Sequence, residues 1–476
     1  MNQIPLHPKY KEFLPRWKEW RDACAGKDAI KAGRETYLPR LAEQTDVEYK
    51  TYIGLATYYN ASGKTLDALS GALFFRPASI SLPPDLATLE SGRKGITSQI
   101  KQAARELVVV GRCGVLAEVD TAGLPRVYLY EAEHILNWCL DEDCNLLWVI
   151  LVEASSAQKG EFEVEVKPRY RVLQLQEGSY VQRVFEEVEK DGKKQLMERL
   201  DLMVIPTDKA GVDLDFIPFV FIDYEGEDGE EGEVGFSPIS DLASVNVGHY
   251  QLGAELRHLL RLTACPMLVI SGLNKKDQPD TLPVGGSTVI YTPADGSATW
   301  AEISGAGAGV LREELVRMED QMSRLGVSAL RAGKADAETA DSIKLQQKGE
   351  SSVLSTVADA LENGFTRLAQ MLGRWYGLDD KAIAAISIGT SKEFFDSSLS
   401  IPEAEFLFKL YLHGDIDLSD LLESLQGGGV LTQEVYQRAL ERVRKATATN
   451  AKANPNNGSS NGIGAVLQTT GQPVGA

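Results

Sequence analysis

Positions 62–65, Ser-Gly-Lys-Thr, carry the residue types that end a phosphate-binding P-loop. In such a loop, a glycine-rich turn after a strand surrounds the phosphates with backbone amides, and the lysine and hydroxyl residue complete the site. The motif requires a first glycine five residues before Gly63, but that position is Tyr58. No strand pattern precedes it either. We therefore expect no nucleotide site at this position.

Two other short segments contain parts of known motifs. Gly305–Gly309 alternates glycine with alanine, but Val310 stands where a dinucleotide-binding loop has its third glycine. The segment is better interpreted as a flexible start of a helix. In residues 349–353, Val353 replaces the last glycine of the nucleophile elbow, and the segment lies within a predicted helix. Neither segment predicts catalysis.

An acidic loop, Asp223–Gly235, has seven carboxylates among its first eleven residues and must be solvated. Its alternating carboxylates suggest a calcium loop, yet Asp228 replaces the glycine and Val234 the bidentate glutamate of an EF-hand. The five histidines are scattered, and His249, on an apolar helical stripe, is interpreted as a packing residue. We expect no catalytic residues, no metal site and no cofactor, so the chain is not predicted to be an enzyme.

Composition narrows the possibilities further. The 476 residues, 43% hydrophobic and 25% charged, are typical of a globular protein with room for two or three domains. A net charge of −19 argues against adhesion to nucleic acid through a basic surface, but it permits DNA to pass nearby without binding tightly. The five cysteines show no CxxC spacing, which predicts reduced thiols. We see no secretory signal and no apolar run that could span a bilayer, so we expect a protein made in a cytoplasm without membrane contact.

The clearest periodicity lies between residues 306 and 377, where two helices are predicted in tandem. The first, about 309–325, has apolar residues spaced three or four apart and a charged opposite face. Its stripe consists of Leu311, Leu315, Met318, Met322 and Leu325. The second, about 337–376, has the stripe Leu354, Val357, Leu361, Phe365, Leu368 and Leu372. The glycine-containing segment between them, with Asp336 as a plausible N-cap, predicts a bend.

A matching helix is predicted before this pair. Ser237 as N-cap and Pro238 in the first turn favour a helix start, and Cys265-Pro266 favours its end. Between the matched helices, the segment 265–305 is rich in proline and glycine, with short strands predicted at Met267–Ile270 and Ser287–Tyr291. Helix, small β insert, helix, loop and long helix is an uncommon order.

The N-terminal half is predicted to be α+β. Residues 48–75 show helical spacing until Arg76-Pro77 and are predicted as one helical run, and residues 96–111 form another helix. Strands follow, predicted at 115–119, 127–130, 146–153 and 169–175. Residues 378–445 are predicted to be helical. From Ala446 the chain loses its aromatic residues, which predicts a disordered tail.

Taken together, this order resembles the portal, or head-to-tail connector, proteins of tailed bacteriophages. Five segments carry the resemblance: Tyr58–Leu66 (YYNASGKTL), Ser237–Gly272 (beginning SPISDLASVNVGHYQL), Glu302–Leu330 (EISGAGAGVLREELVRMEDQMSRLGVSAL), Glu338–Gly377 (beginning ETADSIKLQQKGESSVLSTV) and Leu410–Val430. None is a short catalytic signature, so the resemblance rests on their joint order across residues 40–435.

The resemblance implies a portal-like fold, with a mixed α/β wing, a two-helix stem, a small β clip, a long connecting helix and a helical crown. The implied parts are the wing at 1–237, stem helices at 238–263 and 306–325, the clip at 264–305, a tunnel loop at 326–340, the long wing helix at 341–377, the crown at 378–445 and the tail at 446–476.

The resemblance also implies function and partners. A ring, the dodecamer of the family, would stand at one capsid vertex of the virion after assembly in the host cytoplasm. Double-stranded DNA would pass through it during packaging and ejection. The expected protein partners are the terminase large subunit, head–tail adaptors, the major capsid protein and a scaffolding protein. The alternatives left open are another ring-forming head–tail adaptor or scaffold, and an enzyme with an unrecognised site.

Two groups of residues follow as candidate sites. The tunnel loop and the start of the long helix contain the cations expected to touch DNA in the channel: Arg331, Lys334, Lys344 and Lys348. The clip contains Lys275, Lys276 and Asp277, expected to contribute to docking of the terminase and of adaptors. Ordinary solvated helix charge is the competing interpretation of the basic residues.

Overall fold

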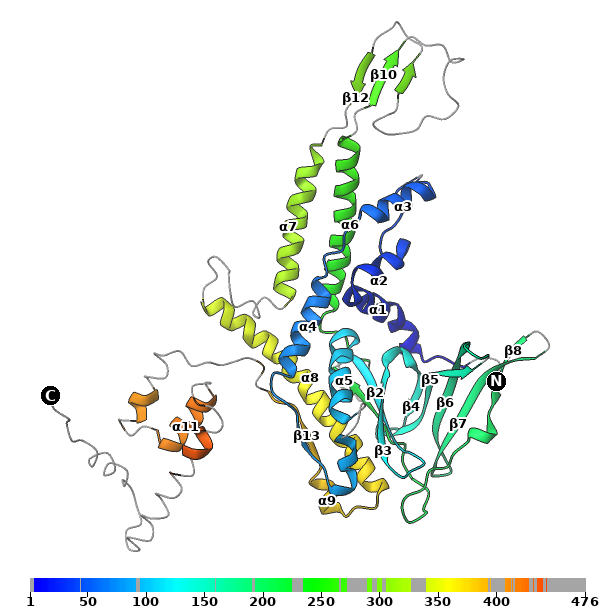
Figure 1. Cartoon of the computed structure of the whole chain (residues 1–476), viewed down its shortest axis with the longest axis vertical. Coiled ribbons are helices and arrows are strands. Elements are labelled where there is room, and N and C mark those ends of the chain that lie inside the picture. Colours follow the sequence, from blue (N-terminus) through cyan, green and yellow to red (C-terminus); the bar gives the residue numbers. More distant parts are fainter. Residues whose placement is uncertain are drawn as a thin grey trace, which may run out of the picture. The chain divides into compact units, whose positions relative to one another are not determined.

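The computed structural model divides into two compact units, Met1–Phe394 and Phe395–Ala476, and each is described by itself (Figure 1). The described residues of the first unit are 4–42, 44–90, 95–158, 160–190, 193–224, 234–264, 267–271, 289–292, 298–301, 305–326, 340–392 and 394. Those of the second unit are 407–411, 413, 416–427, 431, 435–439 and 442. The chain is mixed α and β, as predicted.

The first unit begins with a group of helices. They are α1 (Pro8–Ala25), α2 (Lys27–Ala32), α3 (Asp46–Leu55), α4 (Ala61–Leu73) and α5 (Ile96–Val110), with short 3-10 turns at Arg34–Thr36 and Pro84–Glu90. The helical run predicted for residues 48–75 is wrong in one respect, because it breaks between α3 and α4. The side chain of Asn60 accepts a hydrogen bond from the Gly63 amide at 3.1 Å and so starts a new helix.

Two antiparallel sheets follow α5. The first has the order β3-β2-β9, and the second runs β4-β5-β6-β7-β8. Their strands are β2 (Arg112–Val119), β3 (Pro125–Glu131), β4 (Ile135–Leu140), β5 (Leu146–Gln158), β6 (Val164–Gln176), β7 (Ser179–Lys190), β8 (Lys193–Glu198) and β9 (Phe219–Asp223). All four strand segments predicted between residues 115 and 175 lie within β2, β3, β5 and β6, and these predictions are confirmed.

The strand β6 shows how a single residue limits a sheet. Its ladder with β5 continues through Pro168, which pairs with Ala154, but its ladder with β7 ends one residue away at Arg169. Proline has no amide hydrogen, so its pair with Ala154 must be of the non-hydrogen-bonded kind and its nitrogen faces the β7 side. The β5–β6 ribbon therefore extends beyond β7 as a two-stranded hairpin.

A buried arginine joins the two sheets. The guanidinium of Arg112 contacts the rings of Trp138 and Phe221, 4.3 Å and 4.2 Å from their centroids, and its Nε is 3.1 Å from the Asp223 carboxylate. The ring of His7 also stacks on Trp138, with the two ring centroids 3.8 Å apart. Burial lowers the pKa of Arg112, and the facing π systems and carboxylate favour its cationic form. Strands β2, β4 and β9 are thus held around one cation.

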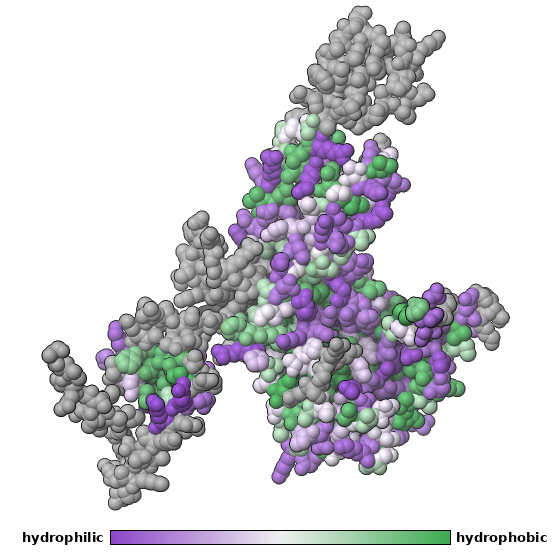
Figure 2. Space-filling model, viewed as in Figure 1, coloured by the Kyte–Doolittle hydropathy of each residue, from purple (hydrophilic) through white to green (hydrophobic). Residues whose placement is uncertain are grey.

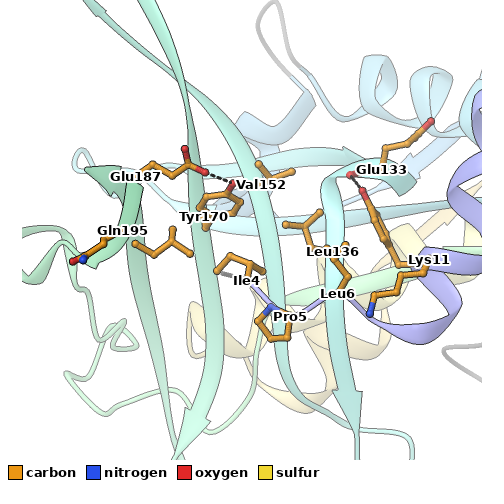
Figure 3. A pocket seen from close by; sticks show the side chains of 12 residues that line it. Ile4, Pro5, Leu6, Lys11, Glu133, Leu136, Val152, Tyr170, Glu187 and Gln195 are labelled. Carbon is orange, nitrogen blue, oxygen red and sulfur yellow. Dashed lines mark hydrogen bonds between the residues drawn. The ribbon is translucent and has the colours of Figure 1, made fainter. Parts of the chain in front are cut away.

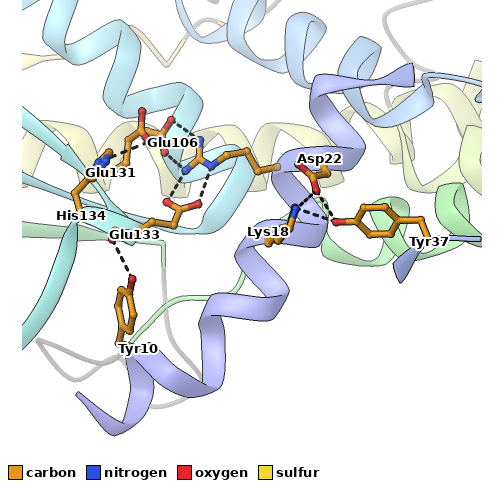
Figure 4. Close-up of polar contacts among 9 residues, drawn as sticks. Tyr10, Lys18, Asp22, Tyr37, Glu106, Glu131, Glu133 and His134 are labelled. Atoms are coloured by element: carbon orange, nitrogen blue, oxygen red, sulfur yellow. Dashed lines mark hydrogen bonds and ion pairs between the residues drawn. The ribbon is translucent and has the colours of Figure 1, made fainter. Parts of the chain in front are cut away.

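Polar contacts attach α1 to this framework (Figure 4). Arg21 binds the carboxylate of Glu106 on α5 at 2.8 Å and that of Glu133, before β4, at 2.7 Å. One guanidinium with two carboxylates forms a bidentate arrangement that fixes direction as well as distance. Farther along α1, Asp22 accepts a hydrogen bond from the Tyr37 hydroxyl at 2.7 Å.

The extreme N-terminal described residues cross one face of the five-stranded sheet. They border a hollow of about 730 Å³ whose lining includes Ile4, Leu6, Leu136, Val152 and Leu196 (Figure 3). Its polar groups mainly contact one another or backbone: Tyr170 donates to Glu187 at 3.3 Å, and Tyr10 donates to the Glu133 carbonyl at 3.2 Å. The segment is attached to β4 by two hydrogen bonds: the His7 amide donates to the Leu136 carbonyl at 3.0 Å, and the Asn137 side chain donates to the Pro5 carbonyl at 2.9 Å.

The chain then leaves the sheets for a helical hairpin. Its parts are α6 (Ser240–Thr263), a three-stranded sheet of β10 (Met267–Ser271), β11 (Val289–Thr292) and β12 (Ala298–Ala301), and α7 (Gly307–Leu325). The long helix α8 (Ala340–Trp375) returns to the core, where it contacts β2, β9 and α5. Six residues of its predicted stripe, from Leu354 to Leu372, are completely buried, and the prediction is confirmed.

The end of the first unit closes with α9 (Asp380–Ala384) and β13 (Ser387–Gly389), which pairs with β1 (Ser79–Ser81). These residues fall within the range predicted as a separate crown, 378–445, yet they pack in the first unit. In the second unit the structure describes α11 (Leu418–Gly427), with Leu421 buried. The predicted tail, 446–476, lies outside the described residues.

Candidate functional site

The two helices of the hairpin run antiparallel in one register. His249 Nε2 lies 3.3 Å from the Glu319 carboxylate, and a methyl group added at Gly248 would lie 2.9 Å from Cε of Met318. The same offset places Gly307 against Leu259 near the other end. Because the residue numbers of each facing pair sum to nearly the same value, the helices stay side by side along their whole length (Figure 1).

The apolar stripes predicted on both helices form their contact. On α7, Met322 is buried, and Leu311, Leu315 and Met318 are half-buried against α6. Leu325, predicted as the last member of the stripe, is 46% exposed and lies outside it. A straight helix drifts relative to a seven-residue repeat, so a stripe of several turns leaves its partner at one end.

Burial differs sharply along the hairpin. We call residues 240–250 of α6, 318–325 of α7 and the C-cap Gly326 the root, and residues 251–263 with 307–317 the distal half. Six of the seven buried residues of α6 lie in the root: Leu242, Ala243, Asn246, Val247, His249 and Tyr250. The distal half of α6 has one, Ala254. Figure 2 shows hydrophobic and hydrophilic residues intermingled on the visible face of this hairpin.

The root is attached to α4 through a fully buried amide, Asn246. Its Oδ1 lies 3.0 Å from both the amide nitrogen and the hydroxyl of Ser62, and 2.9 Å from the Tyr58 hydroxyl. Its Nδ2 donates to the Tyr59 carbonyl at 2.6 Å. Burial raises the pKa of Tyr58, so the phenol keeps its proton and remains a donor across the physiological range. A buried amide with all these partners fixes one orientation of α6 on the body.

This network explains the P-loop-like tetrapeptide at positions 62–65. Ser62 contacts Asn246, and a side chain at Gly63 would meet the Cys24 carbonyl oxygen at 2.5 Å. The hydroxyl of Thr65 lies close to Gly326 at the end of α7. Burial also raises the pKa of the Cys24 thiol to about 12, which disfavours a thiolate there. Of the residues that suggested phosphate binding, Ser62 and Thr65 contact the root of the hairpin, Gly63 lies against α1, and Lys64 is exposed.

The predicted start of α6 needs a correction. Ser237 is not its N-cap, because the helix begins at Ser240 after a turn in which the Ser240 amide bonds to the Ser237 carbonyl at 3.1 Å. The Ser237 hydroxyl instead donates to the Val108 carbonyl at 2.9 Å and accepts from the Ile239 amide at 3.2 Å. The serine attaches the turn to α5 rather than capping the helix.

At the distal end, the chain forms a small sheet between the end of α6 and the start of α7. Strand β10 pairs in parallel with β11 and antiparallel with β12, and short connections join it to α6 and α7. The strand predicted at Met267–Ile270 is confirmed, and the one predicted at Ser287–Tyr291 overlaps β11. The candidate docking residues Lys275, Lys276 and Asp277 lie outside the described residues.

The candidate DNA contacts are described less fully. Arg331 and Lys334 lie outside the described residues, and Lys344 and Lys348 lie on the first turns of α8, where the backbone alone is described. The structure does describe the helices on either side of this segment. Gly326 ends α7 at the root, and α8 begins at Ala340, so the predicted tunnel loop connects the hairpin root to the long helix.

The remaining candidates for chemistry can be placed as well. Gly307 is the first residue of α7, as the flexible helix start predicted, and residues 349–353 lie within α8. Among the described residues, no three His, Cys, Asp or Glu side chains gather as a metal site. Within the same residues no helix is long and apolar enough to cross a membrane.

Sequence reasoning missed both buried polar centres. Asn246 could have been noticed as a polar residue one position after Val245 in an apolar stripe, but its partners are 184 or more residues away in the sequence. Arg112 gave no signal beyond its place at the start of a strand. Such centres depend on tertiary neighbours that periodicity does not reveal.

Comparisons with known proteins give a family match for part of the chain and similarities to solved structures. Residues 238–376 match a family described as Domain of unknown function (DUF4055). That range begins two residues before α6 and ends one residue after α8, so it contains the hairpin, its sheet and the long helix. No curated protein matches the chain. Among solved structures, it is similar to a chain from the "Virion of native gene transfer agent (GTA) particle", at 13% identity and a TM-score of 0.39, over 82% of this chain and 96% of that one. Neither match assigns a biochemical role.

Proposed function

We propose that this chain is the portal protein of a tailed phage or of a phage-like particle, and that it forms a ring through which double-stranded DNA passes. The observation that supports it most is the hairpin. Two antiparallel helices are seated by their root on a mixed α/β body, separated at the far end by a small sheet, and followed by a long helix that returns to the core. This is the order that the portal resemblance implies.

The body, the hairpin and the small sheet would then be wing, stem and clip. A wall of α6–α7 hairpins would surround the channel, because each hairpin leaves apolar side chains exposed in its distal half that a neighbouring hairpin can cover. Examples are Val310 and Val316, which are 68% and 57% exposed. In this proposal the ring is a dodecamer in the virion.

Electrostatics are compatible with a conduit. A net charge of −19 makes the protein a poor general binder of DNA, and a sliding duplex must not be held by many phosphate contacts. The cations of the proposed tunnel segment, Arg331, Lys334, Lys344 and Lys348, would touch phosphates weakly, because salt screens charges beyond about 8 Å at physiological ionic strength. The role is mechanical and structural, without catalysis by this chain.

The proposed partners follow from the same assignment. The terminase large subunit would dock on the clip during packaging, and head–tail adaptors would dock there afterwards, with contributions from Lys275, Lys276 and Asp277. The wing would face the major capsid protein and, during assembly, a scaffolding protein. The virion vertex would be its final location.

The decisive experiment is imaging of the purified full-length protein. Negative-stain microscopy should show rings with a central channel, and native mass spectrometry should give an integral multiple of the 52.0 kDa chain. A folded protein that stays monomeric at all concentrations, by light scattering together with circular dichroism, would contradict the proposal.

A further inference from the structure

The distal half of the hairpin carries a charged residue on each of its two flanks. Glu255 on α6 and Arg312 on α7 are both exposed, and within the described residues neither forms an ion pair. They stand at the same height, because the register that pairs Gly307 with Leu259 and Gly248 with Met318 also places position 312 beside position 255. Opposite charges at one height without contact need an explanation.

The explanation is that they lie on opposite flanks. Each α-helical residue turns by about 100°, so positions can be measured from the stripe that faces the other helix. Glu255 lies about a quarter-turn from the α6 residues that face α7, and Arg312 lies about a quarter-turn from the α7 residues that face α6. The two side chains are on opposite faces of the hairpin. The observed contact of His249 with Glu319 confirms the same geometry, since both lie on the flank of Arg312.

Apolar residues accompany each charge. On the flank of Arg312, Val316 is 57% exposed one turn away, and Leu260 of α6 is 36% exposed nearby. On the flank of Glu255, Leu262 of α6 is half-buried. Flank one is therefore Glu255 with Leu262, and flank two is Arg312 with Val316 and Leu260. Flank one also carries Glu314 of α7, which is paired with Arg317 of the same helix at 2.7 Å. Each flank therefore combines an exposed charge that has no ion-pair partner among the described residues with partly uncovered apolar surface.

We propose that flank one of each chain docks on flank two of a second copy, with Glu255 paired to Arg312 across the contact. This inference rests on the ring of the proposed function. Copies in a closed ring are related by rotation without translation, so equivalent residues stand at equal height along the axis. With stems near parallel to that axis, two charges that match in height but face opposite ways within one chain meet between neighbours.

The contact is heterologous, since two different surfaces meet. Such contacts repeat head to tail and close into rings, whereas a contact of one flank with itself would stop at a dimer. The charge pair would also fix the axial register, because sliding one stem by a helical turn would remove it and place Arg312 beside Gln251 or His258 instead of Glu255. A rim charge pair of this kind contributes mainly specificity.

Charge reversal tests the pair. Glu255→Arg and Arg312→Glu should each raise the protein concentration needed for ring formation by about tenfold, because like charges then face each other. The double variant Glu255→Arg/Arg312→Glu should restore assembly to nearly the wild-type concentration. Glu313→Arg is the matched control: it makes the same charge change on α7 but faces away from α6, and it should leave assembly unchanged.

Cysteine cross-linking tests the geometry independently. After mild oxidation, Glu255→Cys/Arg312→Cys should give a ladder of covalent oligomers on a denaturing gel, whereas each single cysteine variant should match the wild-type background from the five native cysteines. A dimer from Glu255→Cys alone would overturn the heterologous contact. Rings that assemble normally in both single charge reversals would overturn the pair while leaving the proposed function intact. A wild-type protein that never forms rings would overturn the proposed function instead.

Discussion

The root and the distal half of the hairpin share the same two helices but differ in what covers them. In the root, α6 contacts α1 and α4 as well as α7, and Asn246 is fully buried among partners from two other elements. In the distal half, α3 packs against α6, where Arg257 donates to the Leu55 carbonyl at 3.2 Å and the Tyr52 ring contacts His258, while Glu255 and Arg312 on the two flanks are exposed. The root is therefore packed against the rest of the chain, whereas the distal half leaves apolar and charged side chains exposed.

This difference indicates that one end of a helix can stabilise the fold while its other end remains available for assembly. A residue in the root is fixed by neighbours from its own chain, so its substitution should change the free energy of unfolding. A residue on a distal flank has few such neighbours, so its substitution should change assembly and leave the fold nearly unaltered. The predictions below are ordered by their expected effect on that free energy.

Asn246→Ala should have the largest effect. It removes the acceptor for Ser62 and Tyr58 and the donor to the Tyr59 carbonyl. The buried amide and hydroxyl of Ser62 then lose their partner, whereas the Tyr58 hydroxyl keeps the Ala23 carbonyl at 2.8 Å. We expect a loss of about 4 kcal/mol in the free energy of unfolding. Urea denaturation at one fixed protein concentration measures it, since assembly makes stability concentration-dependent. Ser244→Ala, at an exposed position of the same helix, is the control. A loss below about 1 kcal/mol for Asn246→Ala would mean that the Asn246 hydrogen bonds do not stabilise the root.

Met322→Ala should rank second. Its side chain is 3% exposed in the contact between α7 and α6, and truncation leaves a cavity that the two helices can partly close. We expect a loss of about 2 kcal/mol, near the lower end for a buried methionine. The same denaturation assay measures it. Met322→Leu, which nearly conserves volume, should recover most of the loss, and equal losses in both variants would argue against cavity formation as the cause.

These two residues also show what the sequence could reveal. Met322 belongs to a stripe that periodicity predicted, and the long stripe on α8 was predicted completely, because burial on one helical face leaves a regular mark. The small β insert between matched helices was likewise foreseen, from prolines, glycines and short β-branched runs. Features that repeat along the chain could be predicted.

Features made by single side chains across long separations could not. Asn60 breaks a continuous helical pattern through one cap, Ser237 bonds to α5 instead of capping α6, and Asn246 joins elements far apart in sequence. Arg112 is buried because two aromatic rings and a carboxylate converge on it from separate strands. Each depends on tertiary placement. The candidate residues at 275–277 and at 331 and 334 stay predictions, because they lie outside the described residues.

Val316→Ser should weaken ring assembly without changing the stability of the single chain. The side chain is 57% exposed on the distal half, so the free energy of unfolding of the single chain should change by less than about 0.5 kcal/mol. If neighbours cover it, the concentration needed for ring formation should rise about fivefold, which corresponds to about 1 kcal/mol of lost apolar burial. Val47→Ser on α3, where the valine is 77% exposed, is the matched control. Sedimentation velocity measures assembly, and equal behaviour of the two variants would mean that the distal half stays uncovered.

The smallest effect on stability is expected from Arg331→Ala/Lys334→Ala. In the sequence these cations lie between α7 and α8, and they are predicted to face the channel. A solvated charge there contributes little to folding, so the free energy of unfolding and ring formation should be unchanged. Their expected role lies in weak, salt-screened contacts with DNA in the channel, so their removal should alter packaging or retention of the genome. The measurement is packaged DNA length in particles assembled with the variant, and Glu313→Ala on α7 controls for loss of a surface charge. Full-length DNA, packaged at the normal rate and stably retained, would mean that the segment is a passive connection between the root and the long helix.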